Sequence, residues 1–183
     1  VHSMTFTINA DNQSTPHLID EFLSFALGSI RDDNAKDFPV NSPAFDTLVQ
    51  GISPAYMRLG GTPCDETVYS LDQSSDHSLS DYNTYTLNFT TFSNIARFCV
   101  VHNMRFVFGI NEQYRTNTDN SWNKTNVEQL LNAIKSYNTI PGDPYLFAVE
   151  LGNEPDLYSI QGSKYGYVNI SAEQEAKYFG TLY

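Results

Sequence analysis

Short apolar runs alternate along this chain with longer segments whose apolar residues recur every three or four positions. The runs have the length and composition of buried strands, and the segments between them have the pattern of amphipathic helices. We predict strands over 21–28, 55–61, 104–110 and 146–151, and helices over 43–52, over 90–103, from 125 and from 171. Strict alternation of strand and helix predicts an α/β fold with a parallel sheet.

Capping signals mark where several of these helices begin. Ser42 precedes a proline, and Thr125 and Ser171 each precede a glutamate or glutamine by three positions, which is the capping-box pattern. The helix after Ser42 is expected to pack through an apolar face that includes Leu48 and Val49. The segment 62–88, between the second strand and the second helix, is polar and has no helical or strand period. It is too long for a simple connection, so we expect a functional loop there.

The fourth run, LFAVELGNEP over 146–155, is the most informative stretch of the chain. Its apolar residues are those of a strand buried on both faces, and the strand must end at or before Pro155 because proline cannot donate to a sheet. Asn153 and Glu154 therefore come at the carboxyl end of a parallel strand, where reactive side chains collect in α/β folds. A strand ending in Asn-Glu-Pro resembles the fourth strand of clan A retaining glycosidases. The alternative is a solvated carboxylate with no chemical role.

The second strand, AYMRLGG over 55–61, carries an arginine in its centre. Alternation puts Tyr56, Arg58 and Gly60 on one face and Met57 and Leu59 on the other. A buried arginine is costly unless a carboxylate meets it, so we expect Arg58 to hold an active-site carboxylate. The alternative is an arginine whose head reaches solvent beyond the strand end.

Composition and charge narrow the function further. The chain has 183 residues, 40% of them hydrophobic, which suits one folded domain with a sizeable core. No apolar run is long enough to span a membrane. The formal net charge of −11 disfavours nucleic acids and anionic membranes as partners.

The cysteines and glycosylation sequons bear on compartment. Cys64 and Cys99 cannot form a metal site by spacing, and we expect neither a metal nor a cofactor. We also expect these two cysteines to be unbonded, because Cys64 follows a strand whereas Cys99 lies at the far end of the next helix. Sequons fit a secreted or lysosome-like glycoprotein and occur at Asn12, Asn88, Asn123 and Asn169.

Three phrases together resemble one family. SPAYMRLGGT over 53–62, FGIN…RT over 108–116 and VELGNEPDLY over 149–158 are similar to the heparanase family, the family 79 glycoside hydrolases, in order and in spacing. The resemblance covers nearly the whole chain. It implies that 16–183 is the first half, about four βα units, of a (β/α)8 barrel, since a complete barrel needs about 250 residues. Residues 1–15, with an alternating strand at Met4–Ile8, would belong to a β-sandwich whose remainder is C-terminal to this chain.

The resemblance also implies site residues and an activity. It implies a retaining hydrolase of β-linked uronides with Glu154 as the general acid/base and Asn153 as the partner of the sugar 2-hydroxyl. Arg58 would lie near the nucleophile, Gly61 and Thr62 would bind sugar, and Asn111 would line the cleft. The mechanism needs a second carboxylate about 5 to 5.5 Å away. Glu150 lies too far along the strand and is expected to be buried, so the nucleophile is expected in the missing C-terminal half.

Two departures from the family favour a β-glucuronidase-like enzyme over heparanase proper. Gly28 stands where heparanases carry an acidic sugar contact, which is lost or shifted to Asp32 or Asp33. The segment 76–92 has no lysine or arginine, whereas heparanases have a basic stretch there that holds sulfated chains. The competing hypothesis is a non-enzymatic relative that keeps the fold and binds carbohydrate or protein.

Overall fold

The computed structural model describes residues 19–28, 38, 42–70, 85–115, 121–137, 146–165 and 167–182. The strand expected at Met4–Ile8 and the acidic positions 32 and 33 lie outside these residues. The sequon at Asn12 does so as well.

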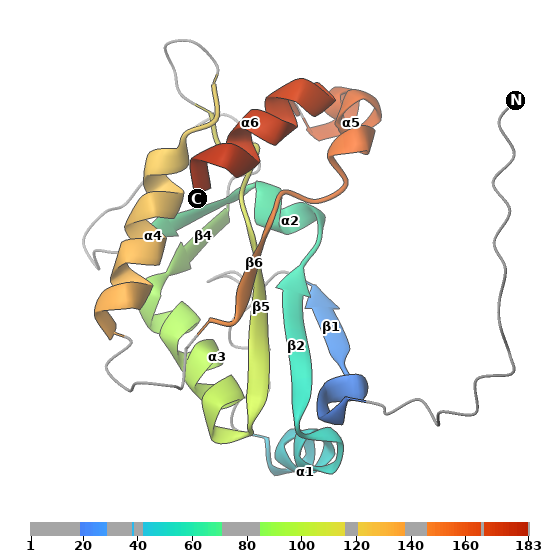
Figure 1. Ribbon diagram of the computed structural model, residues 1–183, viewed down its shortest axis with the longest axis vertical. Helices are drawn as coiled ribbons and strands as arrows, with labels where there is room; N and C mark the ends of the chain where they lie inside the picture. Colours follow the sequence, from blue (N-terminus) through green and yellow to red (C-terminus); the bar gives the residue numbers. More distant parts are fainter. Residues whose placement is uncertain are drawn as a thin grey trace, which may run out of the picture.

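Four parallel strands form the main sheet, in the spatial order β1-β2-β5-β6 (Figure 1). They are β1 (Phe25–Gly28), β2 (Ala55–Gly60), β5 (Met104–Ile110) and β6 (Ala148–Leu151). Neighbours in the sheet are also successive among the four predicted strands, with a helix in every connection. This confirms the predicted α/β fold with a parallel sheet built from βα units.

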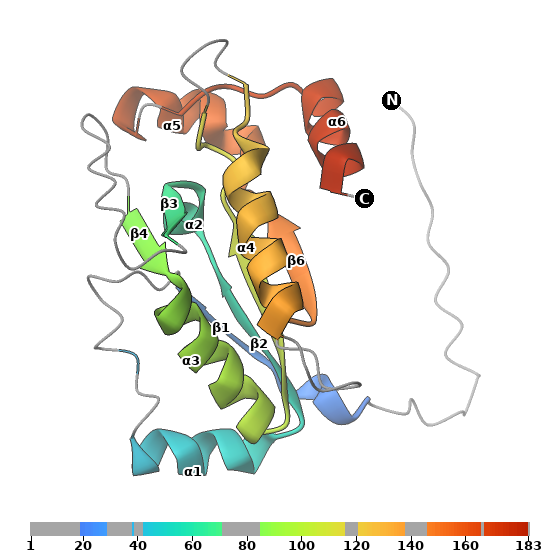
Figure 2. The same cartoon turned by 90° about the vertical axis from the view of Figure 1, so that its left-hand side faces the viewer.

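The helices are arranged around one face and both ends of this sheet. α3 (Phe89–Val101) and α4 (Lys124–Tyr137) lie side by side on one face, as Figure 2 shows. α1 (Pro43–Ile52) lies at the amino-terminal end of the strands, where the short 3-10 helix η1 (Asp20–Phe22) leads into β1. At the carboxyl end lie α2 (Thr62–Asp65), the 3-10 helix η3 (Pro155–Leu157), α5 (Tyr158–Tyr165) and α6 (Ala172–Leu182).

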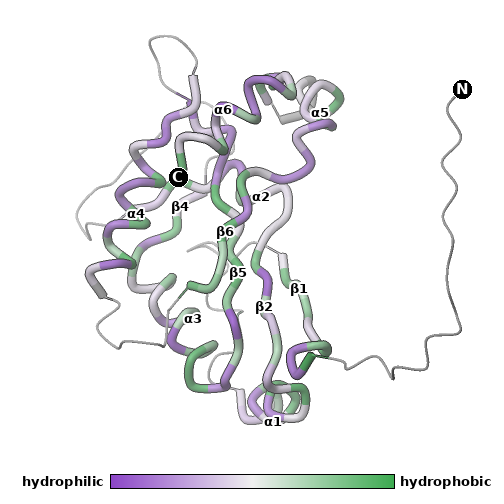
Figure 3. The backbone as a smooth tube through the Cα atoms, viewed as in Figure 1, coloured by the Kyte–Doolittle hydropathy of each residue, from purple (hydrophilic) through white to green (hydrophobic). Residues whose placement is uncertain are grey.

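The core lies between the sheet and the helices α3 and α4. Its strand residues are on the face predicted from alternation, since Met57 and Leu59 are buried while Tyr56 and Arg58 are half-buried. Figure 3 shows a short hydrophilic segment, in purple, within each of β2 and β5. Among the described residues, no helix covers the opposite face of the sheet.

Several sequence predictions need correction. The segment 62–88 is not an unstructured loop, because it contains α2 and a two-stranded parallel sheet of β3 (Thr67–Ser70) and β4 (Tyr85–Asn88). Asn126 of α4 helps to order this segment, since its side-chain amide forms hydrogen bonds with both the N–H and the C=O of Tyr69.

Three further corrections concern burial and helix bounds. β6 is not buried on both faces, because three of its four residues are half-buried. α4 begins at Lys124 instead of Thr125, and Leu48 of α1 is 70% exposed.

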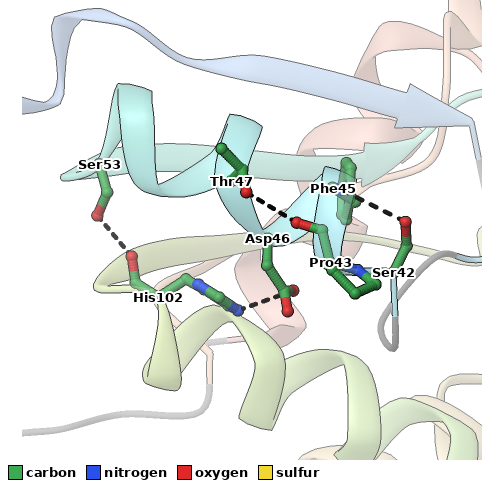
Figure 4. A network of polar contacts seen from close by, with 7 residues as sticks. All are labelled: Ser42, Pro43, Phe45, Asp46, Thr47, Ser53 and His102. Carbon is green, nitrogen blue, oxygen red and sulfur yellow. Dashed lines mark hydrogen bonds and ion pairs between the residues drawn. The ribbon is translucent and has the colours of Figure 1, made fainter.

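The amino-terminal end of the sheet is held by a polar network between α1 and the end of α3 (Figure 4). Ser42 caps α1, as predicted, by accepting a hydrogen bond from the N–H of Phe45. The His102 ring lies 3.3 Å from the Asp46 carboxylate, and the Ser53 hydroxyl donates to the backbone C=O of His102. Since the serine contacts the histidine backbone and not its ring, this is not a nucleophilic Ser-His-Asp arrangement. It ties two helices together at the end of the sheet away from Asn153 and Glu154.

Candidate functional site

Asn153 and Glu154 come directly after β6, at the carboxyl end of the sheet, as the sequence predicted. Glu154 is exposed, and its backbone has φ 53° and ψ 55°, in the left-handed region. A non-glycine residue in that region is strained by about 1 to 3 kcal/mol and persists only where the surroundings hold it, which is common at active sites. The Asn153 amide lies 3.4 Å from a carboxylate oxygen of Glu154, so the two side chains are neighbours.

Buried polar side chains hold this segment through hydrogen bonds to its backbone. The N–H of Asn153 donates to Asp65 Oδ2 at 3.1 Å and to the hydroxyl of Tyr158 at 3.2 Å. The Tyr158 hydroxyl in turn donates to Glu112 Oε2 at 3.2 Å. Asp65, Glu112 and Tyr158 are all fully buried. The exposed Asn153-Glu154 pair therefore rests on a buried support of two carboxyl groups and a phenol.

Gly152 is required where the chain turns from β6 into this segment. Its φ is +64°, a value that L side chains rarely adopt. A Cβ at this position would also lie 2.6 Å from the Tyr158 hydroxyl and would overlap the carboxylate of Glu112. The glycine thus gives the turn its backbone conformation and leaves room for the buried support.

Burial favours the protonated form of both buried carboxyl groups. Burial raises the pKa of Asp65 from 3.8 to about 7, against the opposing hydrogen bonds from Tyr158 and from the backbone of Asn153. Burial also raises the pKa of Glu112 from 4.5 to about 9, and a hydrogen bond and like charge from Glu175 of α6 add to that rise. None of the groups that shift these two pKa values most is a lysine or arginine. The support is therefore acidic and uncompensated.

These shifts predict that the protein is more stable in acid. The unfolded chain releases the Asp65 proton near pH 4, whereas the folded protein keeps it until about pH 7. Through Asp65 alone, the free energy of unfolding should be highest below that lower pH and fall by about 1.4 kcal/mol per pH unit between the two values. Glu112 adds a comparable slope between pH 4.5 and about pH 9. Urea denaturation across this range measures the slope, and Asp65→Asn should reduce it. A slope unchanged in that variant would contradict the assignment.

Arg58 meets a carboxylate, but the carboxylate is that of Glu150. Arg58 Nε and Glu150 Oε2 are 2.7 Å apart, and the two side chains are 35% and 39% exposed. The expectation that Glu150 is buried is therefore wrong, because its side chain lies on the sheet face that no described helix covers. An ion pair this exposed contributes about 0 to 1 kcal/mol to stability. Its effect is to fix the orientation of two charged groups on that face.

Glycines occupy this face near the carboxyl ends of the strands. Gly28 pairs with Gly60, and Gly109 pairs with Glu150 in the strand register. A Cβ at Gly60 would lie 2.7 Å from the Arg58 guanidinium carbon, whereas a Cβ at Gly28 would meet nothing within 4 Å. Gly60 thus makes room for the Arg58 side chain and Gly109 for the Cys64 side chain, whereas Gly28 leaves open space beside it.

Gly61 and Thr62 follow β2 at the same end of the sheet, and both are half-buried. Gly61 has φ +103°, a backbone conformation that residues with a side chain rarely adopt, which explains why glycine occupies this position. The Tyr167 hydroxyl donates to the backbone C=O of Thr62 at 3.2 Å. Asn111 is placed differently, since it is fully buried and its amide donates to the C=O of Thr67 in β3. In this structure Asn111 holds β3 and is not exposed to a cleft.

Sequence reasoning missed Asp65, Glu112 and Tyr158. Asp65 and Tyr158 lie within or just after the phrases that carry the family resemblance, and Glu112 directly follows Asn111. Their closeness to these phrases could have marked them as candidates. No spacing in the sequence, however, indicated that three separate elements bring their side chains together beside the backbone of Asn153. Within the described part of the chain, no group of three His, Cys, Asp or Glu side chains has a geometry that could hold a metal ion.

Cys64 and Cys99 are both buried and unbonded, as predicted. Burial raises the pKa of both thiols, that of Cys99 to about 12. Of the sequon asparagines, Asn169 is exposed, while Asn88 and Asn123 are half-buried. Asn88 also caps α3 by accepting from the N–H of Thr91. No helix in the described part of the chain is long and apolar enough to cross a membrane.

Comparison with known proteins found relatives both by sequence and among solved structures, and no family model matches the chain. The chain is 26% identical over 168 residues to hyaluronoglucuronidase from Hirudo nipponia, a match that covers 79% of this chain and 32% of that protein. It is 25% identical over 198 residues to heparanase from Rattus norvegicus, covering 77% and 36%. The solved structure of a 4-O-α-L-rhamnosyl-β-D-glucuronidase from Fusarium oxysporum 12S, in complex with Rha-GlcA, aligns with a TM-score of 0.49 and 20% identity, covering 76% and 29%.

The two sequence matches show distant homology to heparanase and hyaluronoglucuronidase, which are family 79 glycoside hydrolases. They confirm the resemblance inferred from the three phrases. The chain spans about a third of the length of these relatives.

Proposed function

We propose that this chain, as a distant homologue of family 79 glycoside hydrolases, is the catalytic front half of a retaining hydrolase of β-linked uronides. Its four βα units would form the first half of a (β/α)8 barrel. Glu154 is the proposed general acid/base. The activity would belong to the intact protein, meaning this chain together with the remaining half of the barrel.

The observation that carries the proposal is the state of Glu154. Its carboxyl group is exposed at the carboxyl end of a parallel strand, and its backbone is in the left-handed region. Hydrogen bonds to Asp65 and Tyr158 hold the preceding residue. A solvated carboxylate with no role would need neither the strained backbone nor the buried support, so the alternative reading explains the structure less well.

The other residues have separate roles in this proposal. Asn153 lies beside Glu154 and would hydrogen-bond the sugar 2-hydroxyl. The Arg58–Glu150 pair lies on the open sheet face, where Arg58 would face the incoming nucleophile. Gly61 and Thr62 would contact the sugar through the turn after β2. Asn111 has a structural role and no sugar contact.

The second carboxylate would come from beyond this chain. A retaining mechanism needs two carboxyl groups about 5 to 5.5 Å apart, one to donate a proton and one to form the glycosyl-enzyme intermediate. Glu150 is engaged with Arg58, and it lies four residues before Glu154. The barrel half that completes the uncovered face of the sheet is the expected source of the nucleophile. Secretion or a lysosome-like location is also proposed, since it agrees with the sequons and with greater stability in acid.

Hydrolysis of aryl β-D-glucuronides by the intact protein tests this proposal. We expect cleavage of the glucuronide but not of the matching glucoside, with the β anomer of glucuronic acid appearing first by proton NMR, because two displacements retain configuration. Heparin should be retained weakly at physiological salt, because the net charge of this chain is −11. Release of the α anomer, or no cleavage of any uronide, would overturn the proposal.

A further inference from the structure

Glu150 is the charged residue of β6, in a strand that is otherwise apolar. The retaining mechanism needs an acid/base and a nucleophile, and Glu150 is neither of these in the proposed function. Its carboxylate nevertheless accepts a hydrogen bond from Arg58, with Nε and Oε2 2.7 Å apart. Hydrogen bonds between two charged groups at such distances belong to the stronger class. A specific contact therefore occupies a strand position where an apolar residue would be ordinary.

The contact joins two strands that are not neighbours. In the order β1-β2-β5-β6, β5 lies between the strand of Arg58 and the strand of Glu150. With strands about 4.8 Å apart, the two backbones are separated by roughly 10 Å, so both side chains must extend toward each other across β5. No backbone pairing between β2 and β6 brings the two charges together. The hydrogen bond itself decides where the arginine head lies.

Gly60 shows where that head lies. A Cβ on Gly60 would be 2.7 Å from the guanidinium carbon of Arg58, 2.8 Å from Nη2 and 3.0 Å from Nη1. The whole guanidinium group therefore packs against the backbone of Gly60, two residues further along β2. This position brings the cation to the carboxyl end of the sheet, the end at which Asn153 and Glu154 follow β6.

The arginine head has donors to spare. A guanidinium group carries five N–H donors, one at Nε and two at each terminal nitrogen. Within the described part of the chain, the hydrogen bond to Glu150 uses Nε and leaves the terminal nitrogens unused. The side chain of Arg58 is 35% exposed, on the sheet face that no described helix covers. A planar guanidinium group held in this way can bind a second carboxylate through its terminal nitrogens.

We infer that Glu150 is a positioning residue for Arg58. By holding Nε, it fixes the guanidinium group so that the terminal nitrogens face the nucleophilic carboxylate expected from the remaining half of the barrel. This inference rests on the proposed function. The alternative is an ordinary exposed ion pair, which contributes little to stability and whose loss would change nothing.

The physical consequence is an arginine that is already in place when the reaction begins. Without an acceptor at Nε, the long side chain of Arg58 would sample several rotamers. A misplacement of about 1 Å in a reacting or orienting group costs about 10²-fold in rate. Nucleophilic attack is common to every substrate, whatever its leaving group. Loss of Glu150 should therefore slow all substrates alike, whereas loss of a proton donor slows mainly those with poor leaving groups.

The variant Glu150→Leu in the intact protein tests the inference, because leucine has a similar size and cannot accept a hydrogen bond. We expect kcat/KM to fall by about tenfold or more, by a similar factor on phenyl and on 2,4-dinitrophenyl β-D-glucuronide. Glu150→Gln should recover most of the loss, since its amide oxygen can still accept from Nε. Both variants should melt close to the parent temperature, because the pair is exposed.

The matched control is Glu21→Leu. Glu21 pairs with Arg105 at 2.8 Å, at the amino-terminal end of the sheet. The same chemical change there breaks another arginine–glutamate pair far from the strand ends that carry Asn153 and Glu154. We expect near-parent kcat/KM on both substrates.

A double-mutant cycle decides whether Glu150 acts through Arg58. Arg58→Ala alone should lower kcat/KM by about 10²- to 10³-fold, as removal of a preorganised donor does. Adding Glu150→Leu should cause no further loss if the glutamate acts only by holding the arginine. Multiplying losses, a glutamine variant as slow as the leucine variant, or an unaffected Glu150→Leu would each contradict the inference while leaving the proposed function intact. If the parent protein cleaves no uronide, the proposed function itself fails, and the inference fails with it.

Discussion

Replacing Glu154 by glutamine in the intact protein should slow hydrolysis of phenyl β-D-glucuronide by about 10²- to 10⁴-fold. Glutamine keeps the shape of the side chain but cannot donate a proton to the leaving oxygen. Substrates with a very acidic leaving group, such as 2,4-dinitrophenol, should form the glycosyl-enzyme intermediate at close to the parent rate. The values of kcat/KM on a series of aryl glucuronides measure this dependence, because kcat/KM reports the first step whereas kcat on good substrates also reflects the second, in which Glu154 would act as the base.

Asp156→Asn is the matched control for this variant. Asp156 is an exposed carboxylate two residues further along the same segment, so its replacement changes the charge equally. We expect near-parent activity on every substrate. Equal activity in parent and Glu154→Gln, or an equal loss in Glu154→Gln and Asp156→Asn, would mean that Glu154 is not the acid/base.

Replacing Gly152 by alanine should be strongly destabilising, more so than the same change at the described glycines where a Cβ would meet nothing. The backbone at φ +64° is unfavourable for alanine, and its Cβ would displace Tyr158 and Glu112 from their hydrogen bonds. Left-handed strain and a broken buried network together suggest a loss of roughly 2 to 4 kcal/mol in the free energy of unfolding. Urea denaturation measures that loss, and activity should fall with it.

Gly51→Ala in α1 makes the same chemical change without the clash. A Cβ at Gly51 would meet nothing within 4 Å, and its backbone is helical. Alanine there should stabilise the protein by about 0.5 to 1 kcal/mol, because glycine loses more backbone entropy on folding. If Gly152→Ala were no more destabilising than Gly51→Ala, the buried support described here would not hold the Asn153-Glu154 segment.

The sequence by itself determined the order of strands and helices, the parallel sheet and the position of Asn153 and Glu154 at a strand end. These features depend on local periodicity and on residues such as Pro155 that restrict the backbone wherever they occur. The sequence also predicted which residues of the second strand share a face with Arg58, since a strand places successive side chains on opposite faces. The helix starts at Ser42 and Ser171 followed from their caps, because a cap involves residues only three positions apart. Three phrases were sufficient to indicate the family.

Tertiary structure alone decided the partners of the charged groups. Arg58 was expected to hold a carboxylate, but its partner, Glu150, is 92 positions away along the chain. Asn126 turned a polar loop into strands by bonding the backbone of Tyr69, 57 positions away. Asp65, Glu112, Tyr158 and Glu175 come from four different segments, and each is an ordinary polar residue in its own sequence context. The burial of Asp65, Glu112 and Tyr158, their raised pKa values and their support of Asn153 exist only where the carboxyl ends of the strands bring these segments together.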